Sequence, residues 1–402
     1  MDNLQSESTK SIAGGKKSLL RGLQISIFLS LATLMILSIA LMNYLVNPYH
    51  VFSTKFNICD TYDCAFDRET VYPKLKLNRN KIFETVFCGS SSVMLNISDE
   101  TLEKYFPNNS SYKLGVPVVS FNEQYDLIKN FLKANPEVKK IYISVDYDEG
   151  TAGMNENLLP EYTSNFLNKN ELYFLLLSSK TSMYSVDELL TTMKEIVFPT
   201  AMFKLKKNKY FGKINVFKNY KKKVIAEENR YPRMRRTDWA QMKFSTSMFK
   251  ELRKIKDLCE KQGKEVIFYT TPLHAYAIYD IYNQGVYDNF QNFKRELVKI
   301  APFYDFTYIC DISKKPVSAE NPYWIDITHS DLALGDEILK KIVSQKGDYG
   351  RYVTAENIEN ELNFDKRELM KFARDNENSL KKFATYGHLD MYAKQTTFYL
   401  YE

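Results

Sequence analysis

Two short motifs in this chain supply the residue types of a serine nucleophile and its base. The first motif reads V-F-C-G-S-S-S-V-M from Val86, so that an apolar run ends at Gly89 and three serines follow. Glycine permits a tight turn at a strand end, and a serine there projects from the sheet edge at which open α/β sheets bind ligands. Backbone N–H groups beside it can stabilise an oxyanion. Serine-rich turns after strands are also common without such chemistry, so the motif alone indicates little.

The second motif reads W-I-D-I-T-H and contains Asp326 and His329. An aspartate three residues before a histidine can fold back and accept the Nδ1 proton. The imidazole is then held in the tautomer whose Nε2 takes a proton from a serine. Alternatively, Asp326 is a helix cap and His329 a surface residue.

The two motifs together indicate more than either one, because one follows the first predicted strand and the other precedes the last predicted helix. The chain has only 4 histidines, and His329 alone has an acid at a helpful spacing. His274 ends the segment T-P-L-H after another predicted strand, and it either lines the same pocket or is structural. The α/β-hydrolase elbow G-x-S-x-G is excluded, because Val93 stands where its second glycine would be. A glycosidase pair would need carboxylates such as Asp146 and Asp148.

Alternating apolar runs and helix-like segments must position these motifs. Strands are predicted at 85–88, 117–121, 140–145, 265–269 and 304–309, and helices at 98–106, 123–134, 245–262, 288–300 and 333–344. Gly263 is a predicted C-cap. Strands separated by helices indicate a parallel sheet that is covered on both faces, which is an α/β fold.

An uncharged apolar run at 23–46 predicts one transmembrane helix. Its 24 residues would extend roughly 36 Å, enough to cross a hydrocarbon core of ~30 Å. Lys10, Lys16, Lys17 and Arg21 precede the run, and residues 47–54 carry no Lys or Arg, so the N-terminus is predicted to be cytoplasmic. A cleaved signal peptide is the alternative, but the run is long and no A-x-A site follows it.

The predicted organisation is therefore a cytoplasmic N-terminus (1–22), an anchor (23–46), an extracytoplasmic domain (47–345) with an insertion at about 151–243, and a charged helical tail (346–402). The insertion holds a basic stretch at 204–236, with 13 Lys or Arg and only two acids. This stretch is either a solvated surface or a contact for anionic lipid headgroups or an anionic polymer. An exported domain makes nucleic acid an unsuitable partner.

The composition is that of a globular chain with a substantial core, at 402 residues and 44% hydrophobic residues. Of its five cysteines, Cys59 and Cys64 lie four residues apart in a polar loop, where a disulfide is plausible outside the cytoplasm and a metal site is the weaker alternative. Cys88, Cys259 and Cys310 lie in apolar or helical contexts that favour packed thiols. Neither a metal nor another cofactor is predicted.

The pattern Gly89-Ser90-Ser91 after a strand, with Asp326-x-x-His329 near the end of the domain, resembles the SGNH (GDSL-type) hydrolase superfamily. More narrowly, it resembles the anchored, exported members that modify cell-envelope polymers, such as alginate O-acetylation proteins and the D-alanyl-transfer protein of teichoic acid systems. The likeness covers roughly residues 40–345, including the Asn-Pro-Tyr after the anchor. It implies a three-layer fold with a central parallel sheet, an inserted basic subdomain and one N-terminal transmembrane helix.

The resemblance also implies roles for individual residues. Ser91 corresponds to the nucleophile, His329 to the base and Asp326 to the residue that orients it. In these families the nucleophile's own N–H, a glycine and an asparagine from later loops form the oxyanion site. Asn122 is the best match for that asparagine, and Ser92 and His274 are further candidates for the oxyanion or substrate site. The family's G-x-N-D after the third strand is missing, since the chain reads V-D-Y-D from position 145.

The function implied is extracytoplasmic, serine-dependent O-acyl transfer (acetyl or D-alanyl type) to a cell-envelope polysaccharide or teichoic-acid-like polymer, or ester hydrolysis on it. Either reaction would pass through an acyl-serine intermediate. A membrane-bound O-acyltransferase is the partner that the resemblance implies. The alternative is a non-catalytic SGNH-like binding or assembly partner of such an acyltransferase, which the missing G-x-N-D favours and the intact Asp-x-x-His disfavours.

Overall fold

The computed structural model describes residues 2–46, 82–116, 119–147, 236–241, 247–318, 321–386 and 389–390, and between 173 and 190 it describes 173, 176–179, 181–183, 185–186 and 189–190. Cys59, Cys64, Asp148 and nearly all of the basic stretch lie outside these residues. The disulfide and the role of the basic stretch therefore stay predictions. The chain divides into two compact units, residues 1–62 with 161–207 and residues 63–160 with 208–402.

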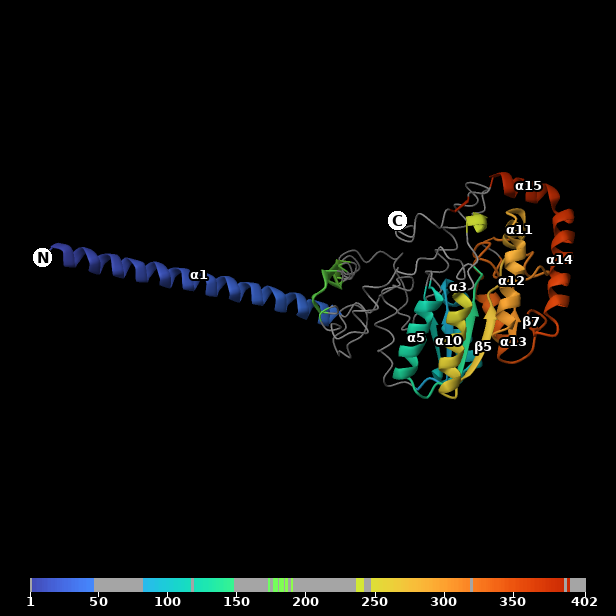
Figure 1. The fold of residues 1–402 in the computed structure, drawn as a ribbon, viewed down its shortest axis with the longest axis horizontal. Coiled ribbons are helices and arrows are strands. Elements are labelled where there is room, and N and C mark those ends of the chain that lie inside the picture. The colour runs from blue at the N-terminus through green and yellow to red at the C-terminus, as the bar shows by residue number, and fades with distance from the viewer. Residues whose placement is uncertain are drawn as a thin grey trace, which may run out of the picture. The chain divides into compact units, whose positions relative to one another are not determined.

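The first unit contains a single long N-terminal helix, α1 (Asp2–Val46) (Figure 1). Its portion Arg21–Val46 is long and apolar enough to cross a membrane. The side chains of this portion are largely exposed, as the 70% exposed fraction of Phe28 illustrates. The position of the predicted anchor at 23–46 agrees with this helix in length and composition.

The second unit is built on a sheet of six strands in the order β2-β1-β3-β5-β6-β7. Their bounds are β1 (Thr85–Gly89), β2 (Ser111–Gly115), β3 (Lys140–Val145), β5 (Glu265–Thr270), β6 (Phe303–Asp305) and β7 (Arg351–Val353). The first five strands run parallel and β7 runs antiparallel to β6. A mixed α/β fold with a mostly parallel central sheet is therefore confirmed.

The predicted position of the second strand, at 117–121, is wrong. β2 is an edge strand, and its half-buried sequence S-Y-K-L-G lacks the continuous apolar run that marks a central strand. The serine of the predicted strand, Ser120, instead starts a helix at Phe121. Its hydroxyl accepts a hydrogen bond from the N–H of Glu123, whose carboxylate accepts one from the N–H of Ser120, forming a capping box.

Helices lie on both faces of the sheet. On one face α5 (Phe121–Ala134) packs against α10 (Ser247–Lys261), while α3 (Ser91–Asn96), α4 (Asp99–Tyr105) and α13 (Leu332–Ile342) pack together on the other. α14 (Ile358–Asp375) packs against α11 (Ala275–Asn283) and α12 (Tyr287–Val298), and α15 (Glu377–Tyr386) against α11 and α14. The remaining short elements are η1 (Pro107–Asn109), η4 (Trp239–Gln241) and the pair β4 (Arg236–Thr237) with β8 (Leu389–Asp390).

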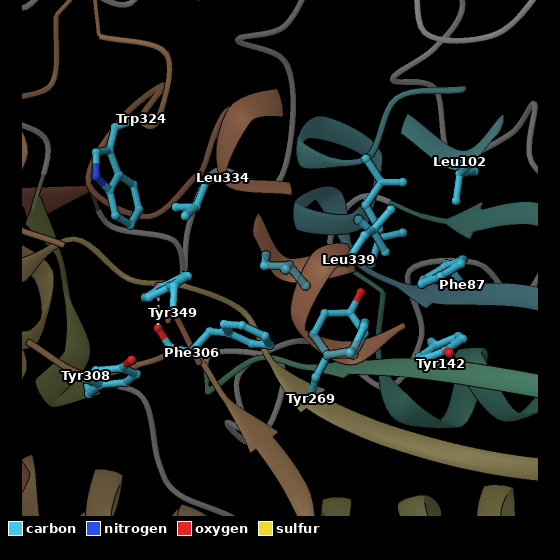
Figure 2. Packing of buried hydrophobic residues seen from close by; sticks show 14 residues of the cluster. Phe87, Leu102, Tyr142, Tyr269, Phe306, Tyr308, Trp324, Leu334, Leu339 and Tyr349 are labelled. Atoms are coloured by element: carbon cyan, nitrogen blue, oxygen red, sulfur yellow. Dashed lines mark hydrogen bonds between the residues drawn. The ribbon is translucent and has the colours of Figure 1, made fainter. Parts of the chain in front are cut away.

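The core beneath α13 is formed by alternate residues of the central strands (Figure 2). Phe87 of β1 and Tyr142 of β3 are paired in the sheet, and their rings stack with centroids 4.5 Å apart. Tyr269 of β5 continues this aromatic row, and Leu334 and Ile338 of α13 pack onto it. Burying each such side chain contributes about 1.5–3 kcal/mol, so this packing holds α13 and the loop before it against the sheet.

The sheet does not end at residue 345, where the sequence analysis placed the end of the domain. β7 extends it, and α14 is joined to it by buried ion pairs. The Nζ of Lys294, whose side chain is 1% exposed, lies 2.7 Å from a carboxylate oxygen of Asp305 and 3.0 Å from one of Asp365. Arg351 pairs with the same two aspartates at 2.7 and 2.8 Å, and with Glu361. This buried cluster connects α12, β6, β7 and α14.

Replacing Lys294 by Met should lower the free energy of unfolding by about 3 kcal/mol, because it leaves two buried carboxylates with Arg351 as their remaining cation. Arg295 offers a matched control, since it is the next residue and pairs with Glu359 at the surface. Arg295→Met should cost less than about 1 kcal/mol. Urea unfolding of the detergent-solubilised chain measures both values, and equal losses would contradict the buried pairing.

Candidate active site

A tight turn between β1 and α3 presents the serines. Gly89 ends the strand, and a Cβ at this position would lie 1.9 Å from the hydroxyl oxygen of Ser144, so no larger residue fits without rearrangement. Ser90 is the N-cap of α3, and its hydroxyl accepts a hydrogen bond from the N–H of Ser92 at 3.2 Å. Ser91 is the first residue of the helix, where N–H groups have no acceptor within the helix.

The carboxyl of Asp146, directly after β3, determines how these serines are arranged. The hydroxyl of Ser90 and the hydroxyl of Thr271, which follows β5, both donate to it. Asp146 is only 5% exposed, and this burial raises its pKa, although the hydrogen bonds with Ser90, Thr271 and Ser92 act in the opposite direction. Because Ser90 is engaged by Asp146, Ser91 is the serine whose hydroxyl remains directed at a base.

The base is held by a closed turn at 323–331. Trp324 and Ser330 form an antiparallel bridge, and the N–H of Ile325 donates to the carbonyl of His329 at 3.0 Å. Inside the turn, one carboxylate oxygen of Asp326 accepts the N–H groups of Thr328 and His329, each at 2.7 Å. The Asp-x-x-His spacing is therefore what allows the aspartate to stabilise the turn that presents the histidine.

The structure brings Ser91, His329 and Asp326 together. The hydroxyl oxygen of Ser91 lies 3.2 Å from Nε2 of His329, and Nδ1 of His329 lies 2.8 Å from a carboxylate oxygen of Asp326. Burial raises the pKa of Asp326, but His329 and the N–H donors outweigh this effect and bring the pKa below its usual value. The ionised Asp326 can only accept a hydrogen bond, so Nδ1 carries the proton and Nε2, which faces Ser91, can accept one.

The helix that carries Ser91 is also attached to the turn that carries His329. The side-chain amide of Asn96, at the end of α3, donates to the hydroxyl of Ser330 at 3.0 Å. A Cβ at Gly335 of α13 would lie 1.5 Å from the carbonyl oxygen of Asn96, so the two helices approach closely there. Both contacts are at Asn96, so they hold the last residue of α3 against the turn that carries the base and against α13.

His274 lies beside this site without joining the triad. It caps α11, with Nδ1 accepting the N–H of Tyr276 at 3.2 Å and Nε2 lying 2.9 Å from the carbonyl oxygen of Lys315. The backbone N–H of His274 donates to the carbonyl of Ile327, and its ring contacts the ring of Trp324 edge-on, with centroids 5.3 Å apart. His274 therefore supports the turn of Asp326 and His329, with both ring nitrogens occupied.

The other residues suggested for the oxyanion or substrate site are less closely placed. Ser92 is buried, and its hydroxyl bonds with Asp146. Asn122 is exposed at the second position of α5, and within the described residues no hydrogen bond connects it to Ser91 or His329. Over the same residues, no group of three or more His, Cys, Asp or Glu is placed to hold a metal ion.

Asp146, Thr271 and Asn96 were not predicted from the sequence to belong to the Ser91 site. A signal was present for the first two, because both directly follow strands at the sheet edge where Ser91 lies. As described, Asp146 serves Ser90 and Thr271, whereas the glycosidase alternative would need it to face a second carboxylate. Asn96 gave no sequence signal, because its partner Ser330 is 234 residues away.

Comparisons with known proteins do not identify a family. No protein-family model matches the chain, and no curated protein matches it. A protein of Streptococcus pneumonia, provisionally assigned as a platelet activating factor, matches with a TM-score of 0.32 and 12% identity over 69% of this chain and 92% of its own. A provisionally assigned acylhydrolase of Bacteroides fragilis matches with a TM-score of 0.30 and 11% identity over 69% and 87%. Similarities of this size carry no argument about activity.

The buried His274 predicts a loss of stability in mild acid. Burial lowers its pKa to about 4 in the folded chain, against ~6.5 when unfolded. The unfolded state therefore binds more protons between these values, and stability should fall as the pH drops from ~6.5 to ~4, by on the order of 3 kcal/mol from this residue. In His274→Asn, which keeps a capping side chain, urea unfolding should show a shallower pH dependence. An unchanged slope would refute the assignment.

Proposed function

We propose that the chain is a serine-dependent acyl-transfer enzyme, an esterase or O-acyltransferase, with Ser91 as nucleophile, His329 as general base and Asp326 as the residue that orients the base. The observation that carries this proposal is the continuous series of contacts from Ser91 to His329 at 3.2 Å and from His329 to Asp326 at 2.8 Å. The side chains of His329 and Asp326 remain 17% and 18% exposed, so the series is not sealed in the core.

In this mechanism the hydroxyl oxygen of Ser91 attacks the carbonyl carbon of an ester or thioester, and its proton moves to Nε2 of His329. The tetrahedral intermediate collapses when the bond to the leaving group breaks, and His329 returns the proton to the leaving alcohol or thiol. The product is an ester on Ser91. Water or an acceptor hydroxyl then attacks this acyl-serine, with His329 again taking and returning the proton, so that the acyl group leaves and Ser91 is restored.

The intermediate's negative oxygen needs hydrogen-bond donors. The N–H of Ser91 lies in the first turn of α3, where backbone N–H groups point out of the helix. Preorganised donors of this kind can contribute about 3–4 kcal/mol each to the transition state. Asn122 is proposed as a second donor because α5 begins at the edge where β1 and β2 end. Its side chain would have to turn toward the acyl group when substrate binds.

A more specific proposal follows from the anchor and the resemblance to the SGNH superfamily. The enzyme would be anchored in the membrane with its catalytic domain outside the cytoplasm. It would transfer or hydrolyse acetyl or D-alanyl esters on a cell-envelope polysaccharide or teichoic-acid-like polymer, beside a membrane-bound O-acyltransferase. The apolar portion Arg21–Val46 supports the anchor, and the 13 basic residues at 204–236 suit an anionic polymer.

One observation favours a second candidate, a non-catalytic binding or assembly partner of such an acyltransferase. After β3, where the enzymes of the superfamily carry an asparagine donor, this chain carries Asp146. Its carboxyl accepts hydrogen bonds from Ser90 and Thr271, and an ionised carboxylate cannot donate to an oxyanion. The intact contacts among Ser91, His329 and Asp326 favour the enzyme over this candidate.

A fluorophosphonate probe tests the enzyme and the choice of serine together. Attack by Ser91 on phosphorus would expel fluoride and leave the probe covalently bound, as His329 takes the serine proton. Wild type should be labelled and Ser91→Ala should lose labelling. Ser92→Ala and Ser90→Ala remove neighbouring hydroxyls as matched controls and should keep labelling, the latter at a reduced rate because Ser90 contacts Asp146.

Asp326→Asn should slow labelling by about 10³- to 10⁴-fold, since it loses the acceptor that keeps the proton on Nδ1. If wild type is unlabelled while Ser91→Ala restores full function in cells, the chain is the non-catalytic partner. If labelling disappears in Ser90→Ala but persists in Ser91→Ala, the nucleophile is Ser90 and the proposed role of Ser91 is wrong.

The proposed orientation has its own test. A reporter enzyme that is active only outside the cytoplasm should be active when fused after residue 60, because the Lys and Arg residues before the anchor favour a cytoplasmic N-terminus. The same reporter fused before residue 10 should be inactive. Activity from the second fusion alone would reverse the predicted topology.

A further inference from the structure

The end of α1 is attached to a segment far along the chain. Asn43 is completely buried, and its side-chain amide donates to the carbonyl of Leu176 at 2.8 Å and to the hydroxyl of Ser182 at 3.0 Å. The described residues between 173 and 190, here called the anchor-bound segment, are helical apart from Ser178, and they belong to the same unit as α1. This attachment places the anchor-bound segment beside the last turns of α1.

Most hydroxyl groups of the anchor-bound segment are buried or half-buried, and that of Ser179 is exposed. Thr181 and Ser185 are completely buried. The hydroxyls of Ser178 and Thr181 lie 2.7 Å apart, and the hydroxyl of Ser182 donates to the carbonyl of Ser178 at 3.0 Å. The hydroxyls of Ser178, Thr181 and Ser182 therefore bond with one another, with the backbone and with Asn43.

Three large apolar side chains are exposed on the same segment. Met183 is 71% exposed, Val186 45% and Leu190 50%. Their spacing of three and four residues places them on one face of a helix. A helix on a water-soluble protein has the opposite arrangement, with apolar residues inside and polar residues outside. Polar groups bonded internally beneath an apolar exterior are the arrangement that a lipid environment requires.

The attachment point also matches the expected edge of the hydrocarbon layer. The 26 residues of Arg21–Val46 extend roughly 39 Å, about 9 Å more than a hydrocarbon core of ~30 Å. Asn43 is three residues from the end of this portion, so it lies about 4.5 Å inside it, near the boundary between acyl chains and headgroups. Tyr44 and Tyr173 are exposed nearby in the same unit, and tyrosine is enriched at that boundary.

We propose that the anchor-bound segment is a second membrane contact, which inserts Met183, Val186 and Leu190 into the headgroup–acyl boundary of the bilayer that α1 crosses. The inference rests on α1 spanning the membrane and is independent of the chemistry at Ser91. Lipid is the occupant that the structure favours, because Met183, Val186 and Leu190 are exposed and apolar and because Asn43 attaches their segment to the end of the apolar helix α1. The first unit then contacts the membrane through two elements, α1 and the anchor-bound segment, instead of one.

Tryptophan quenching by brominated lipid tests this contact in the full-length chain. The native Trp239 and Trp324 are 1% and 0% exposed, so wild type should show little quenching in phosphatidylcholine vesicles with bromine on the acyl chains. Val186→Trp should add fluorescence that bromines near the top of the acyl chain quench at least about twofold more than bromines near its end. Leu34→Trp, at the middle of Arg21–Val46 and 62% exposed in wild type, is the positive control and should show the reverse depth preference.

Two outcomes would overturn the proposal. Unquenched Val186→Trp beside quenched Leu34→Trp would show that the apolar face meets another protein or no partner. Unquenched Leu34→Trp would remove the membrane helix on which the inference rests. Fluorophosphonate labelling of the same vesicles is read separately, so that a failure of the membrane contact is distinguishable from a failure of the proposed catalysis.

Discussion

The constraint on which this structure depends is the meeting of Ser91 and His329, which are 238 residues apart in the chain and 3.2 Å apart at the hydroxyl and Nε2. A parallel sheet can bring such distant residues together, because the carboxyl ends of its strands share one edge, where the loops after β1, β3 and β5 converge. The close approach of Gly335 to Asn96 then sets α13, and the turn before it, against α3. The aromatic row under α13 supplies the rigidity that a distance of this kind requires.

The pKa values of two buried carboxyls at the strand ends, Asp305 and Asp146, are shifted in opposite directions. Burial would raise the pKa of Asp305, but Lys294 and Arg351 outweigh it and hold the pKa below its usual value. Asp146 is surrounded by hydroxyls instead of cations, and its pKa is raised. Asp305 is thus a fixed anion that holds β7 and α14 on the sheet.

The mostly parallel sheet was predictable because the central strands, such as that at 140–145, are largely apolar. Ser91, Asp326 and His329 were predictable as neighbours because their motifs follow the first strand and precede the last helix packed on that sheet. The edge strand β2 was not predictable in this way, because half-buried edge strands carry polar residues that interrupt the apolar pattern of a strand. Asp146 was noticed as a carboxylate, but its hydroxyl partners come from two other strands. The place of the tail was also hidden, since the pairing of Lys294 with Asp365 joins residues 71 positions apart.

The anchor-bound segment shows a further reason why local patterns fail. Sequence rules for helices assume water outside and an apolar core inside, so they look for apolar residues on the buried face. Between 178 and 185 the buried face consists of serine and threonine, and those rules find no element there. The same serines are well placed if the exterior is lipid, because buried hydroxyls can then bind Asn43 and the backbone without facing a solvent that competes for their hydrogen bonds. The described residues between 178 and 185 can therefore be helical although their sequence lacks the amphipathic pattern of a helix in water.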